Sequence, residues 1–212
     1  MSIFDLAGFT SFCDQRDPHL IVPEFLGKFL GWLFDRISKR LDDGTRNPEE
    51  RGLLARLPDF AKFTGDGVLF LWELGDDLAS FYVYEIIEAL RQVCDAYQWN
   101  FLKIIPEYIA NPPPGLRCGI AQGQVVSLGG GEDYVGPCLN LASRLAKVRK
   151  LSLVIAQKGI NLEKNMHRGK PDDFVKKKMK IDGIGEEYVY LLKKEFDALP
   201  KKEKSKFKDI AP

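Results

Sequence analysis

Two aspartates stand beside short apolar runs of this sequence. Asp66 lies at the centre of KFTGDG (62–67), and the apolar run VLFLW (68–72) follows at once. The glycines on either side of Asp66 let the backbone turn, so the stretch predicts a β-hairpin with one carboxylate at its tip. Asp5 ends a short apolar strand and opens DLAGFT (5–10). Carboxylates are ligands of hard divalent cations, although each aspartate by itself also fits a turn or a helix cap.

A second pair of polar side chains lies in GPCLNLASR (136–144). Asn140 and Arg144 are four residues apart on a helix predicted over 138–148, so an amide and a guanidinium lie one above the other on the same helix face. Arg144 alone also fits an ordinary helix surface residue.

Taken together and in this order, DLAGFT, KFTGDG and GPCLNLASR resemble the class III nucleotidyl cyclases, the catalytic domain of adenylate and guanylate cyclases. The resemblance extends from about residue 2 to about residue 192, and the joint set of motifs is far more specific than any one of them. It implies that the 3′-hydroxyl of a nucleoside triphosphate attacks its own α-phosphate and expels pyrophosphate. Such a reaction needs divalent metals and cationic side chains, and no protein nucleophile.

The resemblance also implies roles for four residues. Asp5 and Asp66 stand at the metal-binding positions of the family, which use two Mg²⁺ or Mn²⁺ ions per site. Asn140 corresponds to the residue that orients the ribose, and Arg144 to the residue that stabilises charge at the α-phosphate. In the family the metal pair comes from one subunit and the remaining groups from the other, so the resemblance implies a head-to-tail homodimer with two interface sites.

The choice of base would depend on Lys62 and Asp133. Lys62 precedes Asp66 by four residues and Asp133 precedes Asn140 by seven, which are the spacings of the base-reading residues in adenylate cyclases. A lysine can donate to N1 of adenine and a carboxylate can accept from its 6-amino group, whereas guanine presents the opposite pattern. The resemblance therefore favours ATP and cyclic AMP. GTP and pyrimidine triphosphates stay open as alternatives, and so does the interpretation of these residues as an exposed strand lysine and a turn aspartate.

One position departs from the family pattern. The family usually has a lysine before the Gly-x-Gly of its last strand pair, where it reaches the terminal phosphates, but here Asp182 takes that place. Its negative charge opposes a triphosphate. Lys178 or Lys180 could substitute, because strand alternation predicts both on the same sheet face as Asp182. Asp182 and the short strand before Asp5 favour a second hypothesis, a degenerate cyclase fold that binds a nucleotide or a partner without turnover.

The elements that must position these residues mix strands and helices without a regular βαβ alternation. This predicts an α+β fold with a largely antiparallel sheet, and the resemblance implies the cyclase catalytic-domain fold, a ferredoxin-like sheet with helices packed on it. Apolar residues at helical spacing predict long helices over 23–41 and about 76–105. Further hairpin tips are predicted at the glycines 129–131 and at 182–185.

The domain organisation predicted is one catalytic domain over 1–194, with an insertion at about 42–58. Residues 195–212 are predicted to form a basic, flexible tail. The region 193–212 holds seven lysines and four acidic residues, so the other residues are close to neutral or slightly acidic in a chain whose net charge is +1.

Composition narrows the class of protein further. The 212 residues are 45% hydrophobic and 29% charged, as in an ordinary globular protein. The body has no basic field that would indicate a nucleic-acid binder, and no apolar run approaches the length of a membrane span. No cleavable signal is expected at the start. Four widely spaced cysteines without a CxxC pair indicate reduced thiols and a cytoplasmic protein.

Overall fold

One large sheet forms the centre of the molecule. The structure, a computed structural model, describes residues 1–41, 57–74, 79–162 and 173–210. In this part of the chain, eight strands form a sheet in the order β10-β8-β9-β7-β4-β1-β3-β2, and β5 pairs with β6 in a separate hairpin. The strands are β1 (Ser2–Ala7), β2 (Phe60–Phe63), β3 (Gly67–Leu71), β4 (Gly115–Ile120), β5 (Val126–Leu128), β6 (Asp133–Val135), β7 (Leu153–Ala156), β8 (Phe174–Ile181), β9 (Gly185–Leu192) and β10 (Phe207–Lys208).

The strand pairing is largely antiparallel. β1 lies between β3 and β4 and runs antiparallel to both, and β9 runs antiparallel to β7 and β8. β4 and β7 are the one parallel pair among the described strands. The structure therefore confirms an α+β protein with a largely antiparallel sheet. β1 also continues past Asp5 to Ala7, so the first strand has ordinary length and is not stunted as the sequence suggested.

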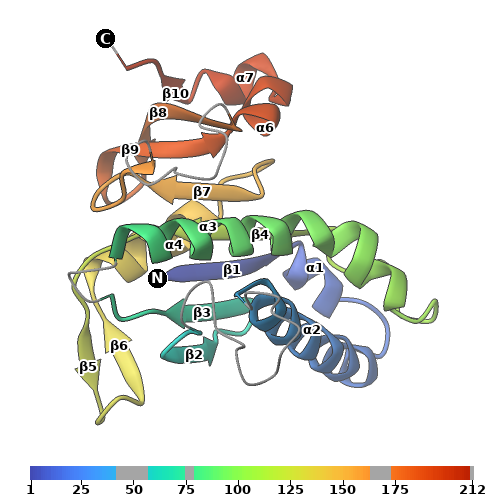
Figure 1. Ribbon diagram of the computed structural model, residues 1–212. Helices are drawn as coiled ribbons and strands as arrows, with labels where there is room; N and C mark the ends of the chain where they lie inside the picture. Colours follow the sequence, from blue (N-terminus) through green and yellow to red (C-terminus); the bar gives the residue numbers. More distant parts are fainter. Residues whose placement is uncertain (42–56, 75–78, 163–172, 211–212) are drawn as a thin grey trace, which may run out of the picture.

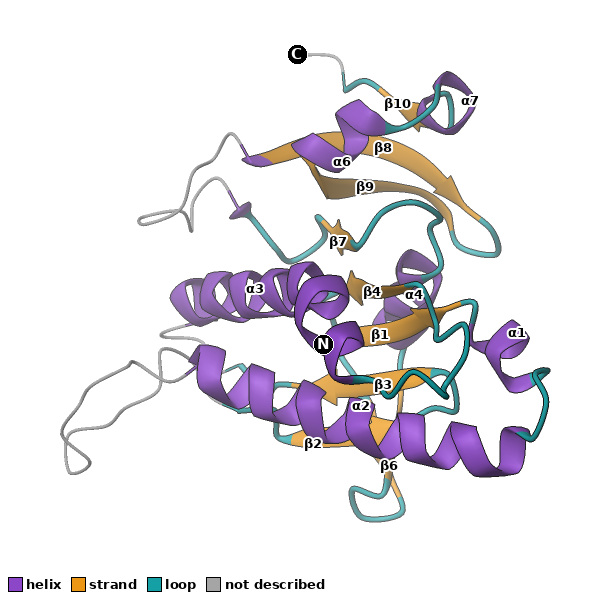
Figure 2. Ribbon diagram, turned by 90° about the vertical axis from the view of Figure 1, so that its right-hand side faces the viewer, coloured by secondary structure: helices purple, strands orange, loops and turns teal. Residues whose placement is uncertain are grey.

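Helices cover both faces of the sheet (Figures 1 and 2). The long helices α2 and α3 pack on one face over a core that includes Phe4, Phe29 and Phe70. α4 packs on the other face over a second cluster that includes Leu145 and Val154. The helical elements are α1 (Phe9–Cys13), α2 (Pro18–Leu41), α3 (Ala79–Ala96), the π-helical η1 (Tyr97–Phe101), the 3₁₀ turn η2 (Leu102–Ile104), α4 (Pro137–Ala146), α6 (Lys193–Ala198) and α7 (Lys201–Lys204).

The predicted hairpins and helices are confirmed. β2–β3, β5–β6 and β8–β9 are antiparallel pairs joined by glycine-containing turns, and the β5–β6 hairpin projects from the body of the molecule (Figure 1). α2 begins at Pro18, earlier than predicted, and it holds Pro23 inside its second turn. Pro18 suits the first position of the helix, because a backbone N–H there would have no partner within the helix and proline has none. No helix among the described residues is long and apolar enough to cross a membrane.

The C-terminal residues differ from the expected flexible tail. α6 and α7 follow β9, and β10 pairs with β8 at the edge of the large sheet. Phe207 packs edge-on against Phe196, and Leu199 is buried. Apolar residues spaced among the lysines thus attach this segment to the sheet, which its charge pattern alone does not indicate. The insertion predicted at 42–58 lies outside the described residues, except for its last two.

Candidate functional site

The two aspartates predicted to bind metal lie on neighbouring segments of backbone, Asp5 in β1 and Asp66 in the turn just before β3. Asp5 on β1 is paired in register with Gly67 on β3, and the Leu6 amide donates to the Asp66 carbonyl at 2.8 Å. A side chain at Gly67 could not be accommodated, because its Cβ would lie 1.8 Å from the Phe4 carbonyl oxygen. Glycine at this position therefore lets the hairpin turn lie against β1 and brings Asp66 beside Asp5.

Arg117 holds Asp5 from the neighbouring strand β4. The two residues are register partners, and both Nε, at 3.0 Å, and Nη2 of Arg117 donate to Oδ2 of Asp5. Asp5 is 4% exposed. Burial raises the pKa of Asp5 above the ordinary carboxyl value, the Arg117 guanidinium opposes the rise, and the charge on Asp66 adds to it. Sequence reasoning did not identify Arg117, since it stands 112 residues from Asp5.

The donor set at this end of the sheet suits a hard cation. Asp5 on β1 and Asp66 in the adjacent β2–β3 turn offer carboxylate oxygens, and Mg²⁺ typically binds through one or two carboxylates together with substrate phosphates. No cluster of three or more histidine, cysteine or acidic side chains that could hold a metal ion occurs in the described ranges. Any metal held here would therefore need further oxygen ligands from a substrate or from water.

Lys62 and Asp133, the predicted base-reading residues, contact each other. Nζ of Lys62 on β2 donates to Oδ2 of Asp133 on β6 at 2.7 Å, and both side chains are about half exposed. Lys62 and the Tyr134 amide together lower the pKa of Asp133. Phe60 and Tyr134 pack edge-on beside this pair, with ring centroids 4.8 Å apart. The β5–β6 hairpin is thus attached to the β2–β3 hairpin by one ion pair and one aromatic contact.

Asn140 and Arg144 lie on the exposed side of α4. The helix begins with Pro137, and it lies directly on β4 because Gly119 has no side chain: a Cβ there would be 2.1 Å from the Ala142 carbonyl oxygen. Both polar residues line a cavity of about 790 Å³ that we call the α4 cavity. Its remaining wall comes from the 122–124 segment, the residues after β7 and the β8–β9 hairpin.

The predicted site residues do not surround one cavity. Asp5, Asp66, Lys62 and Asp133 are absent from the lining of the α4 cavity. The chain instead presents three separate groups: a carboxylate end, where the β2–β3 turn lies beside Asp5 of β1, the Lys62–Asp133 pair, and the polar face of α4. The structure thus brings the members of each predicted pair together and keeps the carboxylate end apart from the α4 cavity.

The β8–β9 hairpin decides between the lysines that could replace the missing one. Met179 and Ile181 point into the cluster beneath α4, so Lys178 and Lys180, which alternate with them, point to the opposite face. Lys178 is also paired with Glu186 at 2.6 Å. Asp182 follows the last residue of β8 and lies in the turn. Neither strand lysine therefore reaches the α4 cavity.

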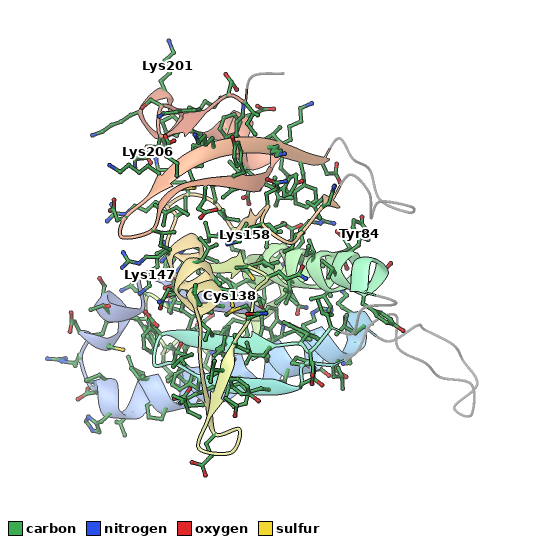
Figure 3. The ribbon with its side chains drawn as sticks, turned by 90° about the vertical axis from the view of Figure 1, so that its left-hand side faces the viewer. Tyr84, Cys138, Lys147, Lys158, Lys201 and Lys206 are labelled. Carbon is green, nitrogen blue, oxygen red and sulfur yellow. The ribbon has the colours of Figure 1, made fainter. Side chains whose placement is uncertain are left out.

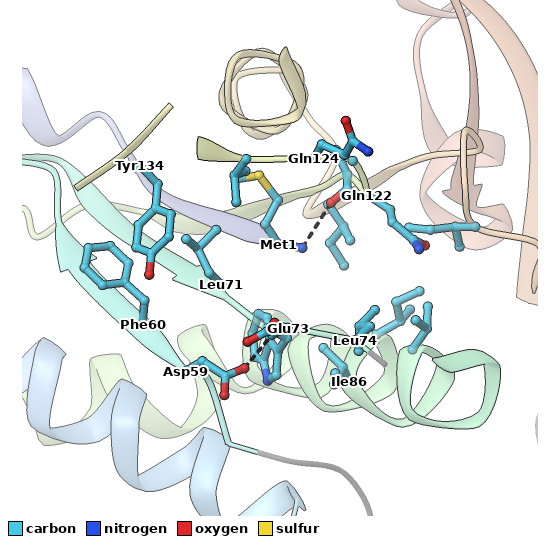
Figure 4. A pocket seen from close by; sticks show the side chains of 18 of the residues that line it. Met1, Asp59, Phe60, Leu71, Glu73, Leu74, Ile86, Gln122, Gln124 and Tyr134 are labelled. Atoms are coloured by element: carbon cyan, nitrogen blue, oxygen red, sulfur yellow. Dashed lines mark hydrogen bonds between the residues drawn. The ribbon is translucent and has the colours of Figure 1, made fainter. Parts of the chain in front are cut away.

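A second cavity, of about 650 Å³, lies between α3 and the end of the sheet (Figure 4). Ile86 and Leu71 contribute to its apolar walls, and Phe60 and Tyr134 lie at one side. None of the sequence-predicted site residues lines it. It is adjacent to the Lys62–Asp133 pair through its two aromatic residues, but its lining offers no chemistry of its own for phosphate transfer.

Comparison with known proteins supports the fold. Neither a scan against protein-family models nor a search of curated proteins found a match. Among solved structures, the chain is similar to a bacterial light-regulated adenylyl cyclase, with a TM-score of 0.54 and 14% sequence identity. The match covers 91% of this chain and 88% of that one. The chain therefore has a cyclase-like fold over nearly its whole length.

Proposed function

We propose that this protein is a nucleotidyl cyclase that converts ATP to 3′,5′-cyclic AMP and pyrophosphate. The ribose 3′-oxygen forms a bond to the α-phosphorus, the bond from that phosphorus to the bridging oxygen breaks, pyrophosphate leaves and the hydroxyl proton passes to solvent. The observation that carries the proposal is that Asp5 on β1 lies beside the turn that holds Asp66, in a fold similar to that of an adenylyl cyclase.

Asp5 and Asp66 would hold the Mg²⁺ or Mn²⁺ ions. When bound, these ions acidify the 3′-hydroxyl and neutralise the charge of the triphosphate. Arg117 orients the buried Asp5 carboxylate, and its charge opposes the rise of the Asp5 pKa that burial causes. Because Asp66 is at a turn and is less buried than Asp5, it is the carboxylate that can adjust to an incoming ion.

The base would be recognised by the Lys62–Asp133 pair. Lys62 can donate to N1 of adenine while Asp133 accepts from the 6-amino group, so the base would insert between two groups that contact each other in its absence. On α4, Asn140 would orient the ribose. Arg144, which is exposed, would stabilise the charge that develops at the α-phosphate.

A homodimer would complete the site. The carboxylate end and the α4 cavity are separate in one chain, so a second copy placed head to tail would unite them. The projecting β5–β6 hairpin exposes Val126, Leu128 and Val135, each by 46% or more. Apolar side chains exposed on one hairpin are typical of a surface that another protein chain covers.

Two observations favour a second candidate function, a cyclase-like module that binds a nucleotide or a partner without turnover. Asp5 already has a cationic partner in Arg117, which competes with a metal ion. Asp182 stands where a phosphate-binding lysine is usual in the resembled family, and the nearby Lys178 is held by Glu186. A cyclase that uses GTP or a pyrimidine triphosphate is a further alternative within the same mechanism.

The first experiment is to incubate the purified protein with Mn²⁺ and each of ATP, GTP, CTP and UTP separately, and to quantify cyclic products by mass spectrometry. Asp66→Ala is the control, and light scattering establishes the oligomeric state. Cyclic AMP from the wild type and none from the variant would support the proposal. Another cyclic nucleotide would retain the mechanism and overturn the base assignment, and a folded dimer without any product would favour the non-catalytic module.

A further inference from the structure

The α4 cavity contains a second cation besides Arg144. Lys158, two residues after the end of β7, contributes to the wall of this cavity together with Asn140 and Arg144. Lys158 and Cys138, another lining residue, are labelled in Figure 3. No motif of the sequence pointed to Lys158, because its place in the cavity depends on how β7 continues beside β9.

The end of the pairing between β7 and β9 sets the position of Lys158. Ala156 is the register partner of Val189, and the Gln157 amide donates to the Tyr188 carbonyl at 2.8 Å. Lys158 and Gly159 then form a turn, in which the Ile160 amide donates to the Gln157 carbonyl at 2.9 Å, so Lys158 lies just beyond the end of the strand pairing. Val189 points into the cluster beneath α4, and Glu187, two residues earlier, lies on the same face of β9. Lys158 and Glu187 both line the α4 cavity, together with Asn140 and Arg144 of α4.

The charges of the lining favour an anion. Arg144 and Lys158 are both exposed, and neither forms an ion pair with the described residues. Glu187 is the one acidic residue among the described lining residues, and it makes no ion pair with either cation. The lining of the cavity, whose volume is about 790 Å³, thus holds one carboxylate and two cationic side chains that form no ion pair with the described residues.

We infer that Lys158 binds the β- and γ-phosphates of the nucleoside triphosphate whose α-phosphate lies at Arg144. This inference rests on the proposed function for the identity of its ligand. An ammonium group is a compact charge with three donors on a flexible stem, so it can follow phosphates that leave together as pyrophosphate. Lys158 would thus perform the role that Asp182 cannot perform, and Glu187 would compete with the phosphates for it.

Isothermal titration calorimetry with inorganic tripolyphosphate and with AMP tests this inference. Lys158→Ala should weaken tripolyphosphate binding about tenfold, as expected for the loss of charge-assisted hydrogen bonds, and should change AMP binding less than twofold. Glu187→Gln should tighten tripolyphosphate binding about threefold by removing a like charge. Lys180→Ala, on the opposite face of the same hairpin, is the matched control and should bind as the wild type does. Thermal unfolding confirms that each variant is folded.

The outcomes separate this inference from the proposed function. If the wild type forms cyclic nucleotide but Lys158→Ala keeps both its tripolyphosphate affinity and its KM, the inference is wrong and the cyclase remains. If no triphosphate is cyclised yet tripolyphosphate binding depends on Lys158, the phosphate site stands and catalysis does not. A wild type that binds no tripolyphosphate, or an equal loss of AMP and tripolyphosphate binding in Lys158→Ala, overturns the inference.

Discussion

The carboxylate end and the α4 cavity differ in how their charged side chains are buried and paired. Asp5 is buried and is already held by Arg117 from the next strand. Arg144 and Lys158 are exposed and have no acidic partner in the described part of the chain. Charge at the carboxylate end is therefore balanced within the protein, whereas charge at the α4 cavity is left for a ligand to balance.

This difference predicts whether a substitution changes the stability of the fold or only binding and rate. A buried charge that loses its partner carries a large desolvation penalty, so changes at the carboxylate end should affect folding as well as function. An exposed cation has little effect on stability, so changes on α4 should affect binding and rate alone.

The largest expected effect is on the rate after Arg144→Ala. If Arg144 stabilises charge at the α-phosphate as proposed, this variant should lower kcat at least about a hundredfold. The thermal midpoint should stay unchanged, since Arg144 is exposed. Steady-state cyclase assays with differential scanning fluorimetry measure both, and a large fall in the midpoint would contradict the comparison.

Mixing inactive variants extends this test to the dimer. Asp66→Ala and Arg144→Ala alter different ends of the site, so in the proposed head-to-tail dimer a pair with one copy of each variant retains one intact site. An equal mixture should recover about a quarter of the wild-type activity, because half of its dimers are mixed and each has one of two sites. No recovery, with subunit exchange verified, would show that both ends act within one chain.

Arg117→Ala should have the largest effect on stability. It leaves Asp5 buried without its guanidinium partner, which should lower the free energy of unfolding by about 3 kcal/mol near neutral pH. Asp5→Asn combined with Arg117→Ala should recover part of this loss, because no charge is left unpaired. Urea denaturation of the wild type, Arg117→Ala, Asp5→Asn and the double variant gives the coupling energy. If the losses in the free energy of unfolding of the two single variants simply add in the double variant, the contact between Asp5 and Arg117 has no coupling energy, and this prediction is wrong.

Exchange of the Lys62–Asp133 pair should change the substrate and leave the fold intact. Lys62→Glu with Asp133→Cys replaces the donor and acceptor pattern that suits adenine by residues typical of guanylate cyclases. The ratio of kcat/KM for GTP to that for ATP should rise, while the thermal midpoint changes little because the pair is exposed. Competition assays with both nucleotides measure the ratio, and an unchanged ratio would remove the base-reading role.

The smallest effect concerns Glu186 at the edge of the sheet. Lys178 and Lys208 lower its pKa from 4.5 to about 2. A carboxylate with a lowered pKa stabilises the folded state at pH values above its unfolded pKa, and this contribution is lost as the pH falls toward about 2. Glu186→Gln should therefore be slightly less stable than the wild type at pH 6 and equal to it at pH 2. Denaturation at both values tests this, and cyclase activity should not differ.

Local sequence determined the elements and the motifs of this protein. Glycines beside Asp66, at 129–131 and at 183 and 185 predicted the hairpin turns, and the apolar spacing predicted the long helices. The positions of Asn140 and Arg144 on one face of α4 also followed from spacing. These features depend on residues that are neighbours in the chain, and their conformational preferences act over a few residues.

Only the tertiary structure decided which groups meet. The register of β1 with β4 places Arg117 on Asp5, and the alternation of β8 turns Lys178 and Lys180 away from α4. The pairing of β7 with β9 places Lys158 in the α4 cavity. Strand register is set by the packing of the entire sheet against its helices, so no spacing within the sequence specifies these partners.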